Sequence, residues 1–356
     1  MLKLLYAQRG SLSFLNIFQY ITFRAAYAAI TALLLCFLLG PWVIARLRTI
    51  GKSSGPREDT PLTHQAKAGT PTMGGVLILL SIVVSILLWQ DPDSIYTWIL
   101  AFAALGFGAI GFADDYLKVT RKTGIKAAAK VGAQFVVSII VVTAIYLERG
   151  DSTTLLYIPF LKRAVLDLSW GYIPFAVILM VGYSNAVNLT DGLDGLAIGL
   201  VIFVALALTV LAYLTGRADY ADYLSIPFVK GGGEISVFCL AVVGASVGFL
   251  WFNAHPAEVW MGDTGSLSLG GMVGVTAIIL KKEILILILG GVFVLETLSV
   301  IIQVVSFQLT GKRVFKMTPL HHHFELSGWP ESRVVTRLWI LGGLFAILGL
   351  STLKIQ

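Results

Sequence analysis

The chain alternates between long apolar stretches and short polar connections. Each stretch approaches the length that crosses a bilayer as a helix, and charged residues, glycine and proline gather between them. The stretches lie at about 18–45, 74–90, 95–113, 129–147, 173–187, 196–214, 235–252, 266–280, 284–308 and 334–353. This pattern predicts an all-α, polytopic integral membrane protein with about ten transmembrane helices. An even number of helices would leave both termini on the same side of the membrane.

Composition agrees with this prediction and excludes a soluble core. Hydrophobic residues make up 57% of the 356 residues, charged residues 13%, and the mean hydropathy is +0.85. No repeat, low-complexity tract or change in composition divides the chain, so we expect one transmembrane domain over 1–356. The first stretch is too long for a signal peptide and lacks a small-residue cleavage site, which predicts a retained helix. Cys36 and Cys239 lie in apolar stretches, so neither a disulfide nor a zinc framework is expected.

The net charge of +6 is informative about orientation, because basic loops of membrane proteins tend to face the cytoplasm. The connections after the first, third, fifth, seventh and ninth predicted helices hold fifteen of the twenty-six Lys and Arg residues. These are Arg46, Arg48, Lys52, Arg57, Lys67, Lys118, Arg121, Lys122, Lys126, Lys130, Lys312, Arg313, Lys316, Arg333 and Arg337. The bias predicts that these connections are cytoplasmic and that both termini are extracytoplasmic.

The most polar segment between two apolar stretches is NAVNLTDGLDGLA, at 185–197. Asn188, Asp191 and Asp194 recur at steps of three, so a helix would project all three from nearly one face. The glycines between them would let a ligand approach the backbone closely. A hydrophilic turn between two membrane helices explains the same composition.

Two other connections suggest phosphate and metal chemistry. Residues 67–75, KAGTPTMGG, place Lys67 and Thr72 ahead of a glycine pair at a helix entrance, which suits a phosphate but also an ordinary helix start. Residues 112–118, FADDYLK, place adjacent acids where the third helix is predicted to end, and Asp114 and Lys118 share a face at i,i+4.

The later connections add further polar candidates. Asp263 stands where the eighth helix begins, as an N-cap or as a ligand for a hard cation. Glu296 and Gln303 are polar at membrane depth, where an interhelical hydrogen bond is the plainer explanation. Three consecutive histidines follow at 321–323, and their spacing does not match a helical zinc pair.

Apart from Glu296 and Gln303, these signals fall in connections predicted to lie on one membrane face. They include five carboxylates, those of Asp114, Asp115, Asp191, Asp194 and Asp263. If the acids meet, each pair about 4 Å apart costs about 4 kcal/mol at an effective dielectric of about 20. A phosphate substrate would add more negative charge, so we expect a divalent cation with oxygen ligands, and Mg²⁺ is the usual one beside phosphates.

The motifs resemble a known family over essentially the whole chain. They are PTMGG at 71–75, DDYLK at 114–118, NAVNLTDGLDGLA at 185–197, MGDTGSLSLGG at 261–271 and TPLHHHFELSGWP at 318–330. They closely resemble the phospho-N-acetylmuramoyl-pentapeptide transferases, the bacterial family within the polyprenyl-phosphate N-acetylhexosamine-1-phosphate transferases. The resemblance implies a ten-helix homodimer of the bacterial inner membrane that uses Mg²⁺ and has its active site facing the cytoplasm. It would transfer phospho-MurNAc-pentapeptide from UDP to undecaprenyl phosphate, giving lipid I and UMP for peptidoglycan synthesis.

By motif position, the resemblance also implies roles for single residues. Asp263 corresponds to the metal-binding aspartate, with Asp115 and Asp191 as further metal candidates. Asp114 and Asp115 correspond to the acids near the metal and the lipid phosphate, and His323 completes the catalytic candidates. The expected substrate-binding residues are Lys67, Thr72, Lys118, Lys130, Asn188, Asp191, Asp194, Asn253, Trp260, Gln303, His321 and His322. Trp260 stands where the family is expected to carry phenylalanine against the uracil ring, and stacking should survive that exchange.

The chemistry of the acceptor argues against a general base. A phosphate monoester has a second pKa near 6, so the acceptor is mostly dianionic at pH 7, and an ordinary aspartate is a poor and mostly unneeded base. We therefore expect Asp114 to position the metal and the nucleophile in a direct attack on the β-phosphorus. A double displacement through a phosphorylated aspartate is the competing route.

Three other functions remain open from the sequence. A related transferase that uses UDP-GlcNAc is the nearest. An ion-coupled transporter also needs acids within the membrane, but at the midplane of repeated halves. A lipid-binding scaffold would explain the basic loops but not the acids.

Overall fold

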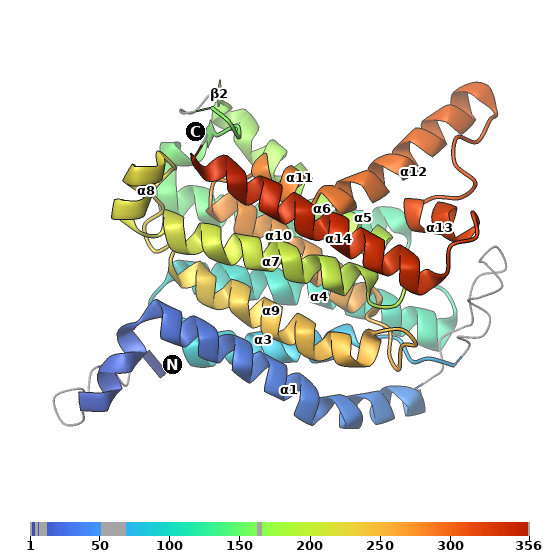
Figure 1. Ribbon diagram of the computed structural model, residues 1–356, viewed down its shortest axis with the longest axis horizontal. Helices are drawn as coiled ribbons and strands as arrows, with labels where there is room; N and C mark the ends of the chain where they lie inside the picture. The colour runs from blue at the N-terminus through green and yellow to red at the C-terminus, as the bar shows by residue number, and fades with distance from the viewer. Residues whose placement is uncertain (1, 4–5, 7–12, 51–68, 162–165, 355–356) are drawn as a thin grey trace.

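The protein is a bundle of long helices that run side by side between two ends (Figure 1). The computed structural model describes residues 2–3, 6, 13–50, 69–161 and 166–354. Its elements are η2 (Ser13–Gln19), α1 (Ile21–Ile50), α3 (Gly75–Trp89), α4 (Ile95–Arg121), α5 (Ala127–Arg149), η3 (Gly150–Thr153), β1 (Leu155–Leu156), β2 (Leu166–Asp167), η4 (Ser169–Gly171), α6 (Tyr172–Thr190), α7 (Leu196–Thr215), α8 (Ala218–Leu224), α9 (Glu234–Asn253), α10 (Gly262–Ile279), α11 (Leu285–Leu289), α12 (Gly291–Thr310), α13 (Leu320–Glu325), α14 (Glu331–Ser351) and η5 (Thr352–Lys354).

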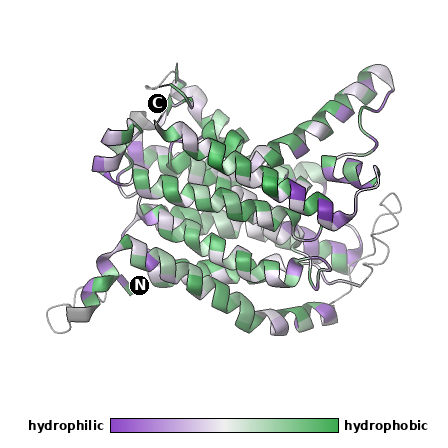
Figure 2. Cartoon of the chain, in the orientation of Figure 1, coloured by the Kyte–Doolittle hydropathy of each residue, from purple (hydrophilic) through white to green (hydrophobic). Residues whose placement is uncertain are grey.

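The all-α, polytopic class predicted from the sequence is confirmed. Eight helices of the described chain are long and apolar enough to cross a membrane, and α3 is a shorter apolar helix. Together with α10, they account for the ten predicted stretches. Figure 2 shows apolar residues through the middle of the bundle and hydrophilic residues toward its two ends.

The two ends of the bundle differ in what they carry. The start of α1 and the end of α14 lie together at one end, which we call the terminus end (Figure 1). The turns between α6 and α7 and between α9 and α10 lie at the other end, beside α13. We call this the site end. Both chain ends therefore lie on one side of the bundle, as an even number of crossings requires.

Helix α10 is the innermost element, and every residue from Thr264 to Ile279 is buried. It packs against α4, α6 and α3. Glycines allow the backbones to touch, because a Cβ at Gly75 would lie 2.1 Å from the Gly265 nitrogen and one at Gly111 would lie 2.1 Å from the Asp263 carbonyl oxygen. Small residues at such contacts are the usual basis of close helix packing in membranes.

The second set of contacts joins α9 to α1, α3 and α7. Arg24 on α1 is almost fully buried here, and its guanidinium donates to both carboxylate oxygens of Glu234 at 2.6 and 2.5 Å. It also donates to the carbonyl oxygen of Trp89 at 3.2 Å. This bidentate pair explains how a charged residue is accommodated within the first apolar stretch.

Two predicted boundaries were wrong. The stretch 284–308 is not one helix, because it divides at Gly290 into α11 and α12. A Cβ at Gly290 would lie 1.5 Å from the Tyr183 hydroxyl, so the contact with α6 requires glycine there. The helix predicted to end near residue 113 continues to Arg121, so Asp114 and Asp115 lie inside α4. The connection between α5 and α6 also forms a short hairpin of β1 and β2.

Candidate active site

Four charged side chains meet at the site end, where α4, α5 and α10 converge. The Lys118 ammonium lies 2.8 Å from Oδ2 of Asp114 and 2.9 Å from Oδ2 of Asp263. The Lys130 ammonium lies 3.2 Å from the same Asp114 oxygen and also contacts Oδ2 of Asp263. The amide of Ile125 donates to Oδ1 of Asp114 at 2.6 Å. Two carboxylates therefore share two ammonium groups, which we call the charge cluster.

Asp115 holds the start of α10, next to the charge cluster. Its Oδ1 accepts the Asp263 amide at 3.1 Å, and its Oδ2 accepts the amide and hydroxyl of Thr264 at 2.9 and 2.7 Å. A carboxylate at a helix N-terminus satisfies free amides and complements the helix dipole. Asp115 thus caps α10 from a neighbouring helix, and this cap fixes the position of Asp263.

Asn188 connects α6 to the same helix start. Its amide donates to Oδ1 of Asp263 at 2.8 Å and contacts the Ser266 hydroxyl at 2.7 Å. The Ser266 hydroxyl in turn donates to the carbonyl oxygen of Gly262 at 3.0 Å. The sequence indicated Asn188 as a site residue but not Ser266. The signal for Ser266 was its position three residues after Asp263 at a predicted helix start.

Asp191 stands beside this group at the C-cap of α6. Among the described residues, its half-buried carboxylate has no hydrogen-bond donor. Burial and the nearby carboxylates of Asp263, Asp115 and Asp194 raise its pKa to about 8. The interpretation that residues 188–194 form one helical face was wrong, since α6 ends at Thr190 and a turn leads to α7.

The segment before α3 lies against the segment before α10. The Trp260 amide donates to the Pro71 carbonyl oxygen at 2.8 Å, and the Gly74 amide donates to the Trp260 carbonyl oxygen at 2.9 Å. This pairing places Thr72 beside Gly262, where an added Cβ would lie 2.8 Å from the Thr72 hydroxyl and 2.6 Å from Oδ2 of Asp115. Thr72 therefore borders the charge cluster. Lys67 lies outside the described residues.

Asp194 belongs to a second cluster, on the other side of the turn. Its Oδ2 accepts the Ala257 amide at 3.1 Å and lies 3.2 Å from Nδ1 of His255, while its Oδ1 accepts the Trp260 indole at 3.3 Å. Glu331 at the start of α14 accepts the Asp194 amide at 2.9 Å and lies 3.5 Å from His255. Sequence analysis missed Glu331, although an acid after proline is typical of a helix start.

Asn253 also joins two backbone segments near Asp194. Its side chain accepts the Gly195 amide at 3.1 Å and donates to the Val259 carbonyl oxygen at 2.9 Å. Asn253 is buried, and both ends of its amide are used by the backbone. It joins the turn after Asp191 to the loop that carries Trp260.

The first histidine of the HHH segment is buried beside the turn that carries Asp191. Nδ1 of His321 lies 3.3 Å from Oε2 of Glu296, which also lies 3.4 Å from the His321 amide. A Cβ at Gly192 would lie 2.3 Å from Nε2 of His321. Both side chains of the pair are fully buried. Glu296, singled out only for its depth in the membrane, thus holds α13 against the Asp191 turn.

The other two histidines and Gln303 make their contacts in α13 and in the loop before it. His322 pairs with Glu325 at 2.9 Å, and Nδ1 of His323 accepts the Lys316 amide at 3.2 Å. The Gln303 side chain donates to the Phe315 carbonyl oxygen at 3.1 Å and accepts the amide of the same residue at 3.0 Å. These contacts shape the loop between α12 and α13.

The structure therefore separates the predicted residues into three groups. Direct contacts join Asp114, Asp115, Lys118, Lys130, Asn188 and Asp263, and Thr72 and Asp191 border them. Asp194, Asn253 and Trp260 form the neighbouring loop cluster. His321, His322, His323 and Gln303 surround α13.

Comparison with known proteins shows which family the chain resembles. Residues 97–281 match the family model for glycosyl transferase family 4, and residues 67–79 match signature 1 of the phospho-N-acetylmuramoyl-pentapeptide-transferases. A phospho-N-acetylmuramoyl-pentapeptide-transferase of Syntrophus aciditrophicus (strain SB) is 51% identical over 356 residues, which cover 99% of each chain. The chain belongs to the phospho-N-acetylmuramoyl-pentapeptide-transferase family. A second such transferase, of Koribacter versatilis (strain Ellin345), is 52% identical over 96% of this chain and 95% of its own.

Membership in this family makes the protein a multi-pass membrane transferase. The signature at 67–79 spans Thr72 and the entrance of α3, and the family 4 match spans α4 to α10. The charge cluster, its α10 cap and Asp191 all lie within the second match. The buried Glu296–His321 pair lies beyond it, in the part of the chain that only the full-length relatives cover.

Proposed function

We propose that this protein transfers phospho-MurNAc-pentapeptide from UDP-MurNAc-pentapeptide to undecaprenyl phosphate, forming lipid I and UMP in peptidoglycan synthesis. The observation that carries the proposal is the charge cluster at the site end of a chain that is similar, over its whole length, to transferases of that name. Two lysines that share two aspartates suit a reaction between two phosphate groups.

We also propose that Mg²⁺ is required and that Asp191 and Asp263 hold it. Both offer hard oxygen donors, and Asp191 has no hydrogen-bond donor among the described residues. Burial and three other carboxylates raise the pKa of Asp191, so a cation there would stabilise its charged form. Asp115 fits a supporting role better, since its oxygens accept hydrogen bonds from backbone amides at the start of α10, whereas the partners of Asp263 are side chains. When bound, the ion would neutralise charge on the transferring phosphoryl group.

The chain's own residues suit a direct displacement. A lipid phosphate oxygen attacks the β-phosphorus, the bond from that phosphorus to the oxygen of the UMP phosphate breaks, and UMP leaves with the electron pair. Lys118 and Lys130 offset the charge that the two phosphates bring. Asp114 keeps these lysines in place and removes no proton, because the acceptor is already mostly dianionic at pH 7.

We propose that the site end faces the cytoplasm of the bacterial inner membrane and that the protein acts as a homodimer. The excess of Lys and Arg in the connections of the site end supports the orientation. The family resemblance supports the dimer. A position at one end of the bundle also fits soluble nucleotide and membrane lipid meeting at a surface, whereas a coupled transporter needs its acids at the midplane.

The test is UMP release by the purified full-length protein with Mg²⁺ and undecaprenyl phosphate. UDP-MurNAc-pentapeptide and UDP-GlcNAc are supplied in parallel reactions, and lipid products are identified by mass. We expect UMP and lipid I with the first donor only. UMP from UDP-GlcNAc alone would identify the related GlcNAc-1-phosphate transferase instead, and no UMP from either donor would overturn the proposal.

A further inference from the structure

The carboxylate of Asp263 contacts three donors, and all of them belong to side chains. Its Oδ1 accepts the Asn188 amide at 2.8 Å. Its Oδ2 contacts two ammonium groups, that of Lys118 at 2.9 Å and that of Lys130. A carboxylate has about four lone-pair directions, so three donors leave about one for a cation. A divalent ion bound there would stand beside two ammonium groups, and repulsion between like charges is strong at such short range. One ammonium group must therefore move when Asp263 binds a cation.

The two lysines differ in how freely they can leave Asp263. The Lys130 side chain is 15% exposed, whereas the Lys118 side chain is 42% exposed. Lys118 also has a second partner on its own helix, because its ammonium lies 2.8 Å from Oδ2 of Asp114 at i,i+4. Asp114 is buried and fixed by the Ile125 amide, which donates to its Oδ1 at 2.6 Å. Lys118 can thus leave Asp263 and keep its ion pair with Asp114.

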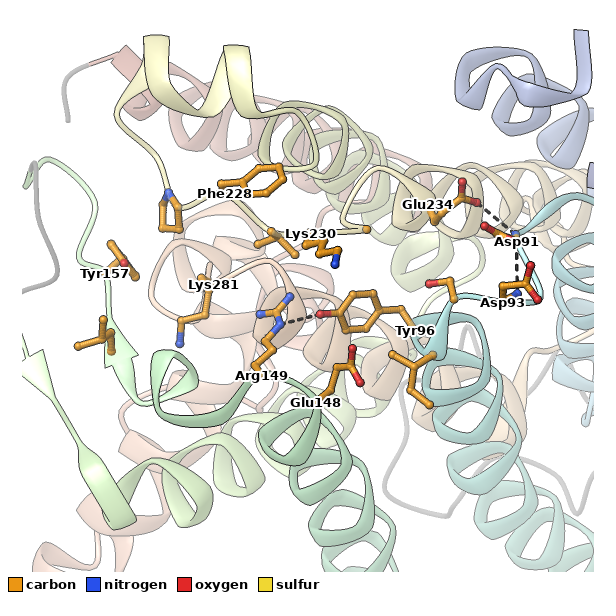
Figure 3. A pocket seen from close by; sticks show the side chains of 16 residues that line it. Asp91, Asp93, Tyr96, Glu148, Arg149, Tyr157, Phe228, Lys230, Glu234 and Lys281 are labelled. Carbon is orange, nitrogen blue, oxygen red and sulfur yellow. Dashed lines mark hydrogen bonds between the residues drawn. The ribbon is translucent and has the colours of Figure 1, made fainter. Parts of the chain in front are cut away.

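A lysine at the terminus end shows the opposite, fixed arrangement (Figure 3). Lys281 lines a cavity of about 710 Å³ together with residues at the start of α4, the other end of that helix from Lys118. It is only 4% exposed, and its ammonium donates to Glu283 at 2.9 Å and to the Thr153 carbonyl oxygen at 2.6 Å. Lys230, in the wall of the same cavity, is exposed. These two lysines are internal references for the reactivity of Lys118.

We propose that Lys118 is an exchangeable partner of Asp263. Lys118 gives up its contact with Asp263 to a divalent cation, keeps its ion pair with Asp114, and turns its freed donors toward a phosphate of the nucleotide substrate. An ammonium group has three donors, so it can serve Asp114 and a phosphate at once. Lys130 stays with both aspartates. The inference rests on the proposed function, because it takes Asp263 as a ligand of the cation and a phosphate as the substrate group.

The exchange links metal binding to phosphate binding. Lys118 is released for a phosphate only after Asp263 has a cation, so each ligand should strengthen the binding of the other through this one side chain. The cation should therefore bind before the nucleotide.

The test is pulse labelling of lysines with an amine-acetylating reagent, measured for each lysine by mass spectrometry on the full-length protein in detergent. The protein is labelled alone, with saturating Mg²⁺, and with Mg²⁺ and UDP, a nucleoside diphosphate. Acetylation of Lys118 should rise severalfold with Mg²⁺ and fall again with UDP. Acetylation of Lys130 should not rise with Mg²⁺, and Lys230 and Lys281 should keep their rates in all three mixtures.

The other outcomes separate this inference from the proposed function. If Mg²⁺ raises the unfolding midpoint but Lys118 labelling is unchanged, or if Lys130 is exposed instead, the exchange is overturned and the metal site stands. If Mg²⁺ leaves the unfolding midpoint unchanged, the proposed metal site fails together with the exchange. Continued reactivity of Lys118 in the presence of UDP would overturn its role as a phosphate donor.

A substitution gives an independent measurement. Lys118→Gln should make Mg²⁺ bind about tenfold more tightly, because a competing ammonium that solvent only partly screens is gone. The concentration dependence of the Mg²⁺-induced shift in unfolding midpoint measures this affinity. The same variant should have a lower kcat, so affinity and turnover change in opposite directions, which a purely structural lysine would not produce. Lys122→Gln, at the exposed C-cap of α4, is the matched control and should change neither. Equal or weaker Mg²⁺ binding in Lys118→Gln would contradict the competition.

Discussion

Asp115 on α4 accepts both the amide and the hydroxyl of Thr264 on α10, at 2.9 and 2.7 Å. The two residues are far apart in the chain, yet their contact caps α10, the innermost helix. This cap fixes the position of the Asp263 side chain at the start of α10. A carboxylate can therefore be essential to the site without touching substrate. Asp115 and Asp191, both acids of the same predicted site, should then respond differently to substitution.

Asp115→Asn should lower both stability and activity. The asparagine amide keeps one acceptor oxygen but opposes an amide donor with its own NH₂ group, which should cost about 1–3 kcal/mol of unfolding free energy. The measurement is the thermal unfolding midpoint in detergent, together with UMP release. A variant with normal stability and no activity would contradict the capping role.

Asp191→Asn is the informative contrast. Because the Asp191 carboxyl has no described donor, and because burial and three neighbouring acids disfavour its charged form, Asp191→Asn should leave the unfolding midpoint unchanged or raise it. Activity should fall at least about a hundredfold if Asp191 holds the ion. Destabilisation as large as that of Asp115→Asn would show that both acids are structural.

Metal affinity should rise with pH up to about pH 8. The pKa of Asp191 is raised to about 8 in the folded protein, so at neutral pH the carboxyl is mostly protonated and must lose a proton to bind a cation. Each unit below pH 8 should therefore weaken Mg²⁺ binding by up to about tenfold. Metal-dependent shifts of the unfolding midpoint at pH 6.5, 7.5 and 8.5 measure this, and Asp191→Asn should remove the pH dependence.

In the metal-free protein, stability should change with pH in the opposite direction to metal affinity. A carboxyl whose pKa is higher when folded binds its proton more tightly in the folded state, so stability falls as the pH rises from about 4 to about 8. Asp191→Asn should flatten that part of the stability profile. A wild-type profile that rises over this range, and that the substitution leaves unchanged, would show that other groups dominate.

The effects of substituting Lys118 and Lys130 on activity should be strongly coupled. Each contacts both Asp114 and Asp263, so losing one ammonium weakens the balance of both acids. Lys118→Gln and Lys130→Gln should each reduce kcat at least about a hundredfold, and the double variant should be little worse than either. Lys122→Gln, in the connection after α4, is the control and should retain activity. Simple multiplication of the two losses would mean that the lysines act separately.

Gly192→Ala should impair the site through His321. The added Cβ would lie 2.3 Å from Nε2 of a fully buried histidine, so either α13 or the Asp191 turn must move. We expect a clear loss of activity and a lower unfolding midpoint. Gly182→Ala on α6 is the matched control, because nothing lies within 4 Å of the added Cβ there. It should be neutral or slightly stabilising.

The sequence predicted the bundle and the shared face of the site well, for physical reasons that lie in local patterns. Spans of apolar residues mark helices directly, and the parity of the connections brings Asp114, Asp191 and Asp263 to one end. The different roles of the aspartates could not be predicted from the sequence, because these roles depend on where the helices end. The motif at 112–118 is polar but still helical, and the motif at 185–197 contains a turn that its three-residue spacing conceals.

Contacts between residues far apart in the chain could not be predicted from the sequence either. Glu296 was noticed for its depth, but only the packing of α12 against α13 pairs it with His321. Likewise, the close contact of Gly290 with the Tyr183 hydroxyl on a distant helix cannot be predicted from the Gly290–Gly291 pair in the apolar stretch. Lys67 lies outside the described residues, so its role stays a prediction.

The loop cluster around Asp194 has a consequence for inhibitors. The Asp194 carboxylate already binds the Trp260 indole, the Ala257 amide and His255. A compound whose donor takes the place of the Trp260 indole at Asp194 also frees that aromatic ring from its anchor. Compounds that stack on Trp260 and leave the aspartate's existing bonds intact should therefore gain affinity that more polar analogues lose.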